Sequence, residues 1–169
     1  MDFVLRKWEG RDVTSVARYI NNRNVQRWLR DGLAFPYTIE DALAFIEGIC
    51  LAADPQKEIM LAIEAGGEAV GSIGVFRKDN VYRKSAELGY WLAEPFWGRG
   101  IMTRAVEQIC AIAFDTLGVV RIFAEPFAEN TKSRRVLEKA GFHLEGTMRR
   151  SVYKEGRVMD SCMYALLRE

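Results

Sequence analysis

The sequence predicts a domain of the α/β class, or α+β in some classifications, built around a mixed β-sheet. The expected elements follow in the order strand, helices, three strands, helix, strand, helix and two strands, which is typical of these classes. The length of 169 residues favours one domain spanning residues 1–169. Hydrophobic residues make up 49% of the chain and charged residues 28%, so it can form both a core and a hydrated surface.

The N-terminal third predicts a strand followed by helices. The expected elements are a strand at 3–8, short helices at 11–22 and 24–32, a loop at 33–38 and a helix at 39–53. Pro36 interrupts the apolar pattern within the loop. Thr38 can cap the following helix, and Glu40 and Asp41 suit its first turn because the helix dipole is positive there.

Three strands are expected next. Segments 58–65 and 68–76 are apolar and rich in β-forming residues, and Gly66 with Gly67 between them predicts a hairpin turn. Segment 85–93, with the sequence SAELGYWLA, predicts the third strand.

Two strand and helix pairs and a final hairpin are expected after that. The elements are a helix at 102–118, a strand at 119–126, a helix at 130–141 and two strands within 142–167 that meet at a turn at 154–157. Apolar residues recur at helical spacing in the first helix, which Gly118 ends. Asn130 can cap the second helix, and Gly141 ends it.

Composition excludes several classes of protein. The net charge of +1 argues against general nucleic-acid binding. The three cysteines are widely separated, which is typical of a reducing compartment and predicts a cytoplasmic protein. No apolar run approaches the length needed to span a bilayer, so no membrane association is expected.

The stretch EPFWGRGIMTRAV, residues 94–106, holds two glycines directly before an expected helix. The first amides of a helix have no partner within the helix and lie at its positive end, so they can bind phosphate. A Walker A motif is absent, and Thr103 breaks the dinucleotide pattern GxGxxG. The alternative is that Gly98 and Gly100 only shape a turn.

Two longer segments resemble the GNAT superfamily of N-acetyltransferases, and most closely its RimJ/RimL-like branch. They are AELGYWLAEPFWGRGIMTRAV at 86–106 and IFAEPFAENTKSRRVLEKAGFHLEGTMR at 122–149. The resemblance implies a mostly antiparallel sheet of about seven strands flanked by helices. It also implies that acetyl-CoA donates an acetyl group to a primary amine.

The resemblance further implies a set of residues that bind acetyl-CoA. The loop would hold the pyrophosphate, and an amide of the preceding strand would polarise the thioester carbonyl. The implied residues are Tyr90, Trp91, Leu92, Trp97, Gly98, Arg99, Gly100, Ile101, Met102, Thr103, Asn130 and Ser133. Met102 departs from the family pattern, which has a small residue at that position.

The residue that protonates the leaving thiolate also departs from the family pattern. Many members carry a tyrosine where this chain has Leu137, which cannot donate a proton. Ser133 lies four residues earlier on the same helix face and is the candidate for this role. The alternative is that Ser133 only hydrogen-bonds locally near the start of its helix.

Glu87 is the candidate base for the acceptor amine. Alternation along its strand places Glu87 on the face of Trp91 and opposite Tyr90. The alternative is a structural carboxylate paired with an arginine. His143 is the only histidine, and neither a metal site nor a serine hydrolase pattern is present. The alternative to direct transfer is a covalent acetyl-cysteine route, but neither of the two resembling segments contains a cysteine, so direct transfer in a ternary complex is expected.

The acceptor pocket is expected to include aromatic residues of the early helices and their loop. Trp28, Phe35 and Tyr37 are candidates for its wall, Asp31 for attracting a cation, and Tyr153 for the opposite wall. The alternative is that the aromatic side chains cover the core. The acceptor is a protein N-terminus or a small molecule such as a polyamine, and a homodimer is possible. A non-catalytic acyl-CoA sensor is the competing function.

Overall fold

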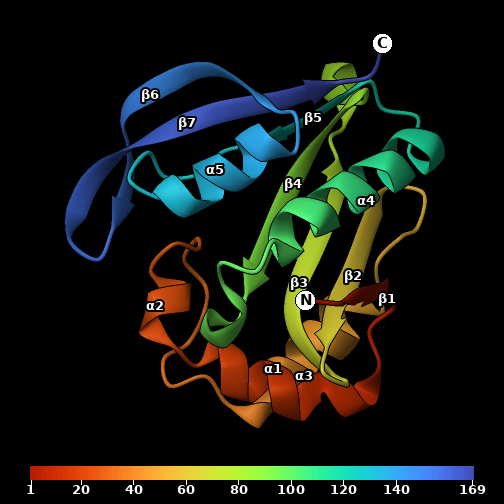
Figure 1. The fold of residues 1–169 in the computed structure, drawn as a ribbon, viewed down its shortest axis with the longest axis vertical. Coiled ribbons are helices and arrows are strands. Elements are labelled where there is room, and N and C mark those ends of the chain that lie inside the picture. Colours follow the sequence, from red (N-terminus) through yellow and green to blue (C-terminus); the bar gives the residue numbers. More distant parts are fainter.

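The computed structural model describes all residues from Met1 to Glu169 and contains one seven-stranded sheet (Figure 1). Its strand order is β1-β2-β3-β4-β5-β7-β6, and only β4 and β5 are parallel. The strands are β1 (Val4–Arg6), β2 (Glu58–Ala65), β3 (Glu68–Arg77), β4 (Ser85–Leu92), β5 (Arg121–Ala124), β6 (His143–Lys154) and β7 (Arg157–Leu167). The predicted mixed, mostly antiparallel sheet is confirmed.

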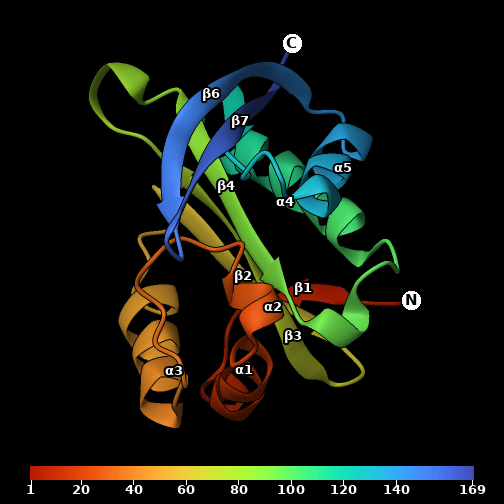
Figure 2. The same ribbon diagram turned by 90° about the vertical axis from the view of Figure 1, so that its left-hand side faces the viewer.

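Helices cover both faces of this sheet. The α-helices are α1 (Val13–Ile20), α2 (Arg23–Gln26), α3 (Ile39–Phe45), α4 (Ile101–Thr116) and α5 (Thr131–Lys139). Short 3-10 turns occur at η1 (Gly10–Asp12), η3 (Asn80–Tyr82) and η4 (Glu94–Phe96), and a π-helical segment, η2, spans Ile46–Cys50. In Figure 2, α4 and α5 lie to the right of the strands, whereas α3 lies to their left.

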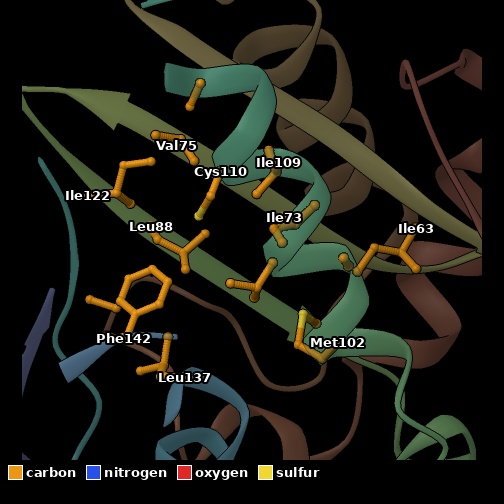
Figure 3. Packing of buried hydrophobic residues seen from close by; sticks show 14 of the residues in the cluster. Ile63, Ile73, Val75, Leu88, Met102, Ile109, Cys110, Ile122, Leu137 and Phe142 are labelled. Carbon is orange, nitrogen blue, oxygen red and sulfur yellow. The ribbon is translucent and has the colours of Figure 1, made fainter. Parts of the chain in front are cut away.

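Each face of the sheet has its own hydrophobic core. The α4 side includes Ile73, Leu88 and Ile109, which are packed together in Figure 3. The α1–α3 side includes Trp8 and Trp91. Two cores are possible because the central strands are buried on both faces, as β3 shows from Ala69 to Val75.

Local signals placed the helix starts correctly. The Thr38 hydroxyl accepts a hydrogen bond from the Asp41 amide, and the Asp41 side chain accepts one from the Thr38 amide, which forms a capping box. The Asn130 side chain accepts a hydrogen bond from the Ser133 amide at 3.3 Å. Both predicted caps are therefore confirmed.

Two predicted helices are too long. The predicted helix at 24–32 ends at Gln26, where the Gln26 amide group donates hydrogen bonds to the carbonyls of Ile20 and Ala34. These contacts hold the following residues as a loop. The predicted helix at 39–53 becomes π-helical after Phe45 and ends at Cys50. Tertiary contacts override helix propensity in the loop.

Strands β4 and β5 separate soon after they meet. They pair only at Ser85–Arg121, Ala86–Ile122 and Glu87–Phe123, so the predicted strand at 119–126 is shortened. Figure 1 shows β4 continuing well beyond the short β5. One edge of β4 from Leu88 to Leu92 therefore has no strand partner, which opens the sheet at its centre.

Candidate active site

A cleft of about 1100 Å³ fills the opening between β4 and β5. Its lining includes residues from both faces of the sheet, such as Tyr37 on the α1–α3 side and Thr103 and Ser133 on the α4–α5 side. The cleft therefore passes through the sheet, and two molecules can meet in it from opposite faces.

The glycine-containing loop lies at one end of this cleft. Gly98 and Gly100 have φ angles of 73° and 74°, which L-residues with side chains adopt only at a cost. Gly100 is the N-cap of α4, and no side chain caps this helix. None of the amides from Gly98 to Thr103 has a hydrogen-bond partner in the structure. This row of free donors at a helix N-terminus suits an anion.

Met102 does not obstruct this loop. Its side chain is buried, and Figure 3 shows it within the core beside α4. Ile101 is also fully buried, so the two side chains anchor the helix start while the amides remain free. The long side chain at position 102 is thus compatible with a ligand above the loop.

The bare edge of β4 leads from this loop toward Glu87. The indole of Trp97 donates a hydrogen bond to the Leu92 carbonyl at 2.7 Å and so ties the loop to the end of β4. The Lys132 ammonium lies 4.6 Å from the centre of the Trp97 ring, and Arg135 also lines the cleft. Lys132 thus lies at the loop end of the cleft, and both cations make the cleft more favourable for anions.

Tyr90 and Ser133 form a pair of hydroxyl groups on the α5 side of β4. Their oxygens are 2.6 Å apart. Burial raises the pKa of Tyr90 to about 12, so the phenol stays protonated at neutral pH. Leu137, one turn further along α5, is fully buried in the core (Figure 3). The two hydroxyl groups both line the cleft, whereas the Leu137 side chain has no proton to donate.

Glu87 lies on the opposite face of β4 and is paired with Arg30. The guanidinium donates two hydrogen bonds to the carboxylate, at 2.9 and 3.2 Å. This bond raises the pKa of Arg30. The same guanidinium lies 3.9 Å from the carboxylate of Glu125, directly after β5. The predicted alternative, a carboxylate paired with an arginine, therefore describes Glu87 in this structure.

The predicted acceptor residues divide into three groups. Trp28 and Tyr37 line the cleft, and the Trp28 ring lies 6.5 Å from that of Phe127. Asp31 and Tyr153 line a second cavity of about 330 Å³ next to the cleft. Phe35 lines neither cavity, contrary to the prediction. It is half exposed, and the Arg23 guanidinium covers its ring at 4.1 Å.

Comparison with known proteins identifies the fold and the family. The family model of the acetyltransferase (GNAT) domain matches residues 2–143. The chain belongs to the GNAT acetyltransferase family. It is 34% identical to the putative ribosomal N-acetyltransferase YdaF of Bacillus subtilis over 170 residues, covering 97% of this chain and 90% of that protein.

Two further relatives of this GNAT enzyme, one a solved structure and one a sequence, have names that state a ligand or an acceptor. RimJ of Mycobacterium smegmatis in complex with CoA-disulfide superposes with a TM-score of 0.86 at 26% identity, covering 98% of this chain and 81% of that one. The spermidine N(1)-acetyltransferase of Escherichia coli is 27% identical over 157 residues, covering 90% of this chain and 79% of that protein. The relatives thus include enzymes named for a ribosomal and for a polyamine acceptor.

The predicted RimJ/RimL-like branch and the acetyl-CoA-dependent N-acetyltransferase activity are confirmed by these relatives. In this GNAT enzyme, no group of three or more histidine, cysteine or acidic side chains is arranged to hold a metal ion. None of its helices has both the length and the apolar character needed to cross a bilayer.

Sequence reasoning missed two residues of this GNAT site. Arg30 and Glu125 meet Glu87 in the cleft although Arg30 lies 57 residues before Glu87. Nothing in the local sequence around Arg30 distinguishes it from other exposed arginines. The position of Glu125 could have been predicted, because this residue directly follows β5, the strand that is parallel to the strand of Glu87.

Proposed function

We propose that this chain, as a single domain over residues 1–169, transfers the acetyl group of acetyl-CoA to a primary amine by direct attack in a ternary complex. The observation that carries the proposal is the row of free amides from Gly98 to Thr103 beside the bare edge of β4. A diphosphate on the loop and an extended chain along β4 would satisfy both sets of donors.

The residues present fit acetyl-CoA. The amides of Gly98 to Thr103 would hold the diphosphate, with Lys132 and Arg135 as flanking cations. The space around Gly98 and Gly100 is open, since a Cβ atom at either position would have no heavy atom within 4 Å, and this lets phosphate approach the backbone. Backbone groups of Tyr90, Trp91 and Leu92 would pair with the pantetheine arm, and Asn130, which also lines the cleft, would hydrogen-bond the same arm. The bound acetyl-CoA supplies an acetyl group activated as a thioester.

Two proton-handling sites lie on opposite faces of β4. Glu87 and Tyr90 are three residues apart, which is about 10 Å along an extended strand. On the α5 side, Ser133 Oγ provides a proton to the leaving sulfur, and the Tyr90 hydroxyl replaces it. On the other side, Glu87 accepts the proton that the acceptor nitrogen loses. Separate faces keep the acid and the base from neutralising each other.

The acceptor is best explained as an ammonium-bearing chain, with a protein α-amine as the first candidate. An α-amine has a pKa of roughly 7.7–8.0 and loses its proton more easily than a lysine or polyamine, with a pKa near ~10.4. A carboxylate such as Glu87, whose side chain is 19% exposed, suits the easier deprotonation. Relatives named for ribosomal and for spermidine acceptors support both classes.

Three buried free cysteines, at positions 50, 110 and 162, support the proposed cytoplasmic location, because reducing compartments keep thiols unpaired. Burial raises the pKa of Cys110 to about 12, so that thiol is a poor nucleophile. A covalent acetyl-cysteine route therefore has little support, and direct transfer remains the proposal.

A screen for CoA release tests the function. The chain is incubated with acetyl-CoA and a panel of peptides with free N-termini, polyamines and amino acids, and free thiol is measured. Release that depends on one acceptor class is expected. An acyl-CoA sensor, the competing function, would bind CoA by calorimetry yet release no thiol with any amine.

A further inference from the structure

The smaller cavity of about 330 Å³ has no role in the mechanism above. It is formed by the turn at Arg30 and Asp31 on one side and by the β6–β7 hairpin, including Tyr153 and Lys154, on the other. It shares Arg30, Glu125 and Phe127 with the main cleft. The two cavities therefore meet where the Arg30 side chain lies.

Glu125 is held at this junction by the hairpin. The Ser161 hydroxyl, in a residue that is only 1% exposed, donates to the Glu125 carboxylate at 3.4 Å. The Ser151 hydroxyl lies 2.6 Å from that of Ser161 and extends the same network toward the smaller cavity. The hairpin therefore contacts the Glu125 carboxylate at the passage between the two cavities.

Arg30 is more exposed than the two carboxylates that it contacts, Glu87 and Glu125. Its side chain is 68% exposed, and its polar contacts are those with Glu87 and Glu125. Exposed ion pairs contribute little to stability and exchange readily. The guanidinium carries the same single positive charge as a substrate ammonium group, and it contacts the carboxylate of the candidate base, Glu87.

We propose that the smaller cavity is the entrance for the acceptor, and that the acceptor's ammonium group replaces the Arg30 guanidinium between Glu87 and Glu125. The inference rests on the proposed function and adds Glu125 as an acceptor-binding residue. Arg30 closes the passage in the free protein, and its departure frees the Glu87 carboxylate to accept a proton. The remainder of the acceptor, a peptide or a polyamine chain, lies along Tyr153 and beside the ion pair that Asp31 forms with Lys154 at 3.3 Å.

Kinetics with two acceptors test this arrangement, using spermidine and an alanine tetrapeptide with a free N-terminus. Glu125→Gln is expected to raise the KM of the accepted amine by roughly tenfold or more, because a charge-assisted hydrogen bond is lost. The KM for acetyl-CoA is expected to stay unchanged. Glu129→Gln is the matched control, since that carboxylate pairs with Arg157 and lines neither cavity.

Arg30→Ala distinguishes a placeholder from a residue that binds or orients the acceptor. Removing a placeholder lowers the acceptor KM, by up to roughly fivefold for an exposed ion pair. A higher acceptor KM in this variant would overturn the inference, and so would an unchanged KM in Glu125→Gln. Whichever of the two acceptors is acetylated, the peptide or spermidine, identifies the class of molecule that supplies the ammonium group.

A binding measurement separates this inference from the proposed function. Methylguanidinium is titrated by calorimetry onto wild type, Arg30→Ala and the double variant Arg30→Ala, Glu125→Gln. Binding to Arg30→Ala alone is expected, because only that variant has both carboxylates and no guanidinium between them. Equal binding to wild type, or none to Arg30→Ala, overturns the inference. If no amine gives CoA release in the screen, the proposed function is contradicted. The methylguanidinium titration still tests the further inference in that case, because it does not depend on turnover.

Discussion

Replacing Gly100 by aspartate places a negative charge where the diphosphate is proposed to bind. Gly100 is exposed and has a φ of 74°, and a Cβ atom at this position would have no heavy atom within 4 Å. Aspartate and asparagine are among the side chains that tolerate this left-handed conformation. Gly100→Asn is therefore the matched control, with the same shape and strain but no charge.

The expected loss of affinity follows from the charges. A carboxylate about 4 Å from one phosphate charge is repelled by about 1 kcal/mol at the dielectric constant of water and by about 4 kcal/mol at an effective value of 20. Because the loop is exposed, the lower part of this range applies, and two phosphate charges give ~2–3 kcal/mol. This energy corresponds to a Kd for CoA that is about 30- to 150-fold weaker than that of Gly100→Asn.

Calorimetric titration of CoA onto both variants measures this difference, and thermal melts show whether both remain folded. The gap between the variants is expected to narrow as salt rises, because exposed charges are screened. Equal affinity of Gly100→Asp and Gly100→Asn would refute the placement of the diphosphate on this loop.

Three further perturbations test other parts of the reasoning. Ser133→Ala and Tyr90→Phe are each expected to lower kcat about 100-fold with little change in the KM for acetyl-CoA, and an effect on KM alone would exclude a role in proton transfer. Burial raises the pKa of Asp12, but its hydrogen bonds with Arg6 and the Glu9 amide outweigh this and hold it below the ordinary value. The Asp12–Arg6 pair thus stabilises the fold above the unfolded pKa of ~3.9, and this stabilisation is lost as the pH falls through the lower pKa of the folded state. Asp12→Asn should therefore make the free energy of unfolding less dependent on pH in acid, as followed by circular dichroism. Leu137→Ala should cost about 2–5 kcal/mol in urea unfolding, and a cost near zero would contradict its place in the core.

Features that depend on neighbouring residues were predictable from the sequence. The capping of α3 by Thr38 and of α5 by Asn130 follows from side chains that reach amides three residues away. The turn at Gly98 and Gly100 likewise follows from their freedom to adopt positive φ. The glycine turn before α4 is thus a local feature, visible before any tertiary contact is known.

The loop after α2 was predicted poorly for the opposite reason. Residues 24–32 have helical spacing, yet Arg30 contacts Glu87, 57 residues away in the chain. Phe35 has an aromatic side chain suited to a pocket wall, but the loop turns it toward Arg23 and away from both cavities. Helix propensity and residue type carry no information about these distant partners.

The amino-acid sequence alone determined the order of elements, the glycine turn before α4 and the alternation that places Glu87 and Tyr90 on opposite faces of one strand. The tertiary structure decided where β4 and β5 separate, that Tyr90 meets Ser133, and that Arg30 lies between Glu87 and Glu125. The physical reason is the separation in sequence between the residues that interact. Backbone conformation and side-chain alternation are set within a few residues, whereas the partner of a charge or a hydroxyl is set by how the sheet folds distant segments together.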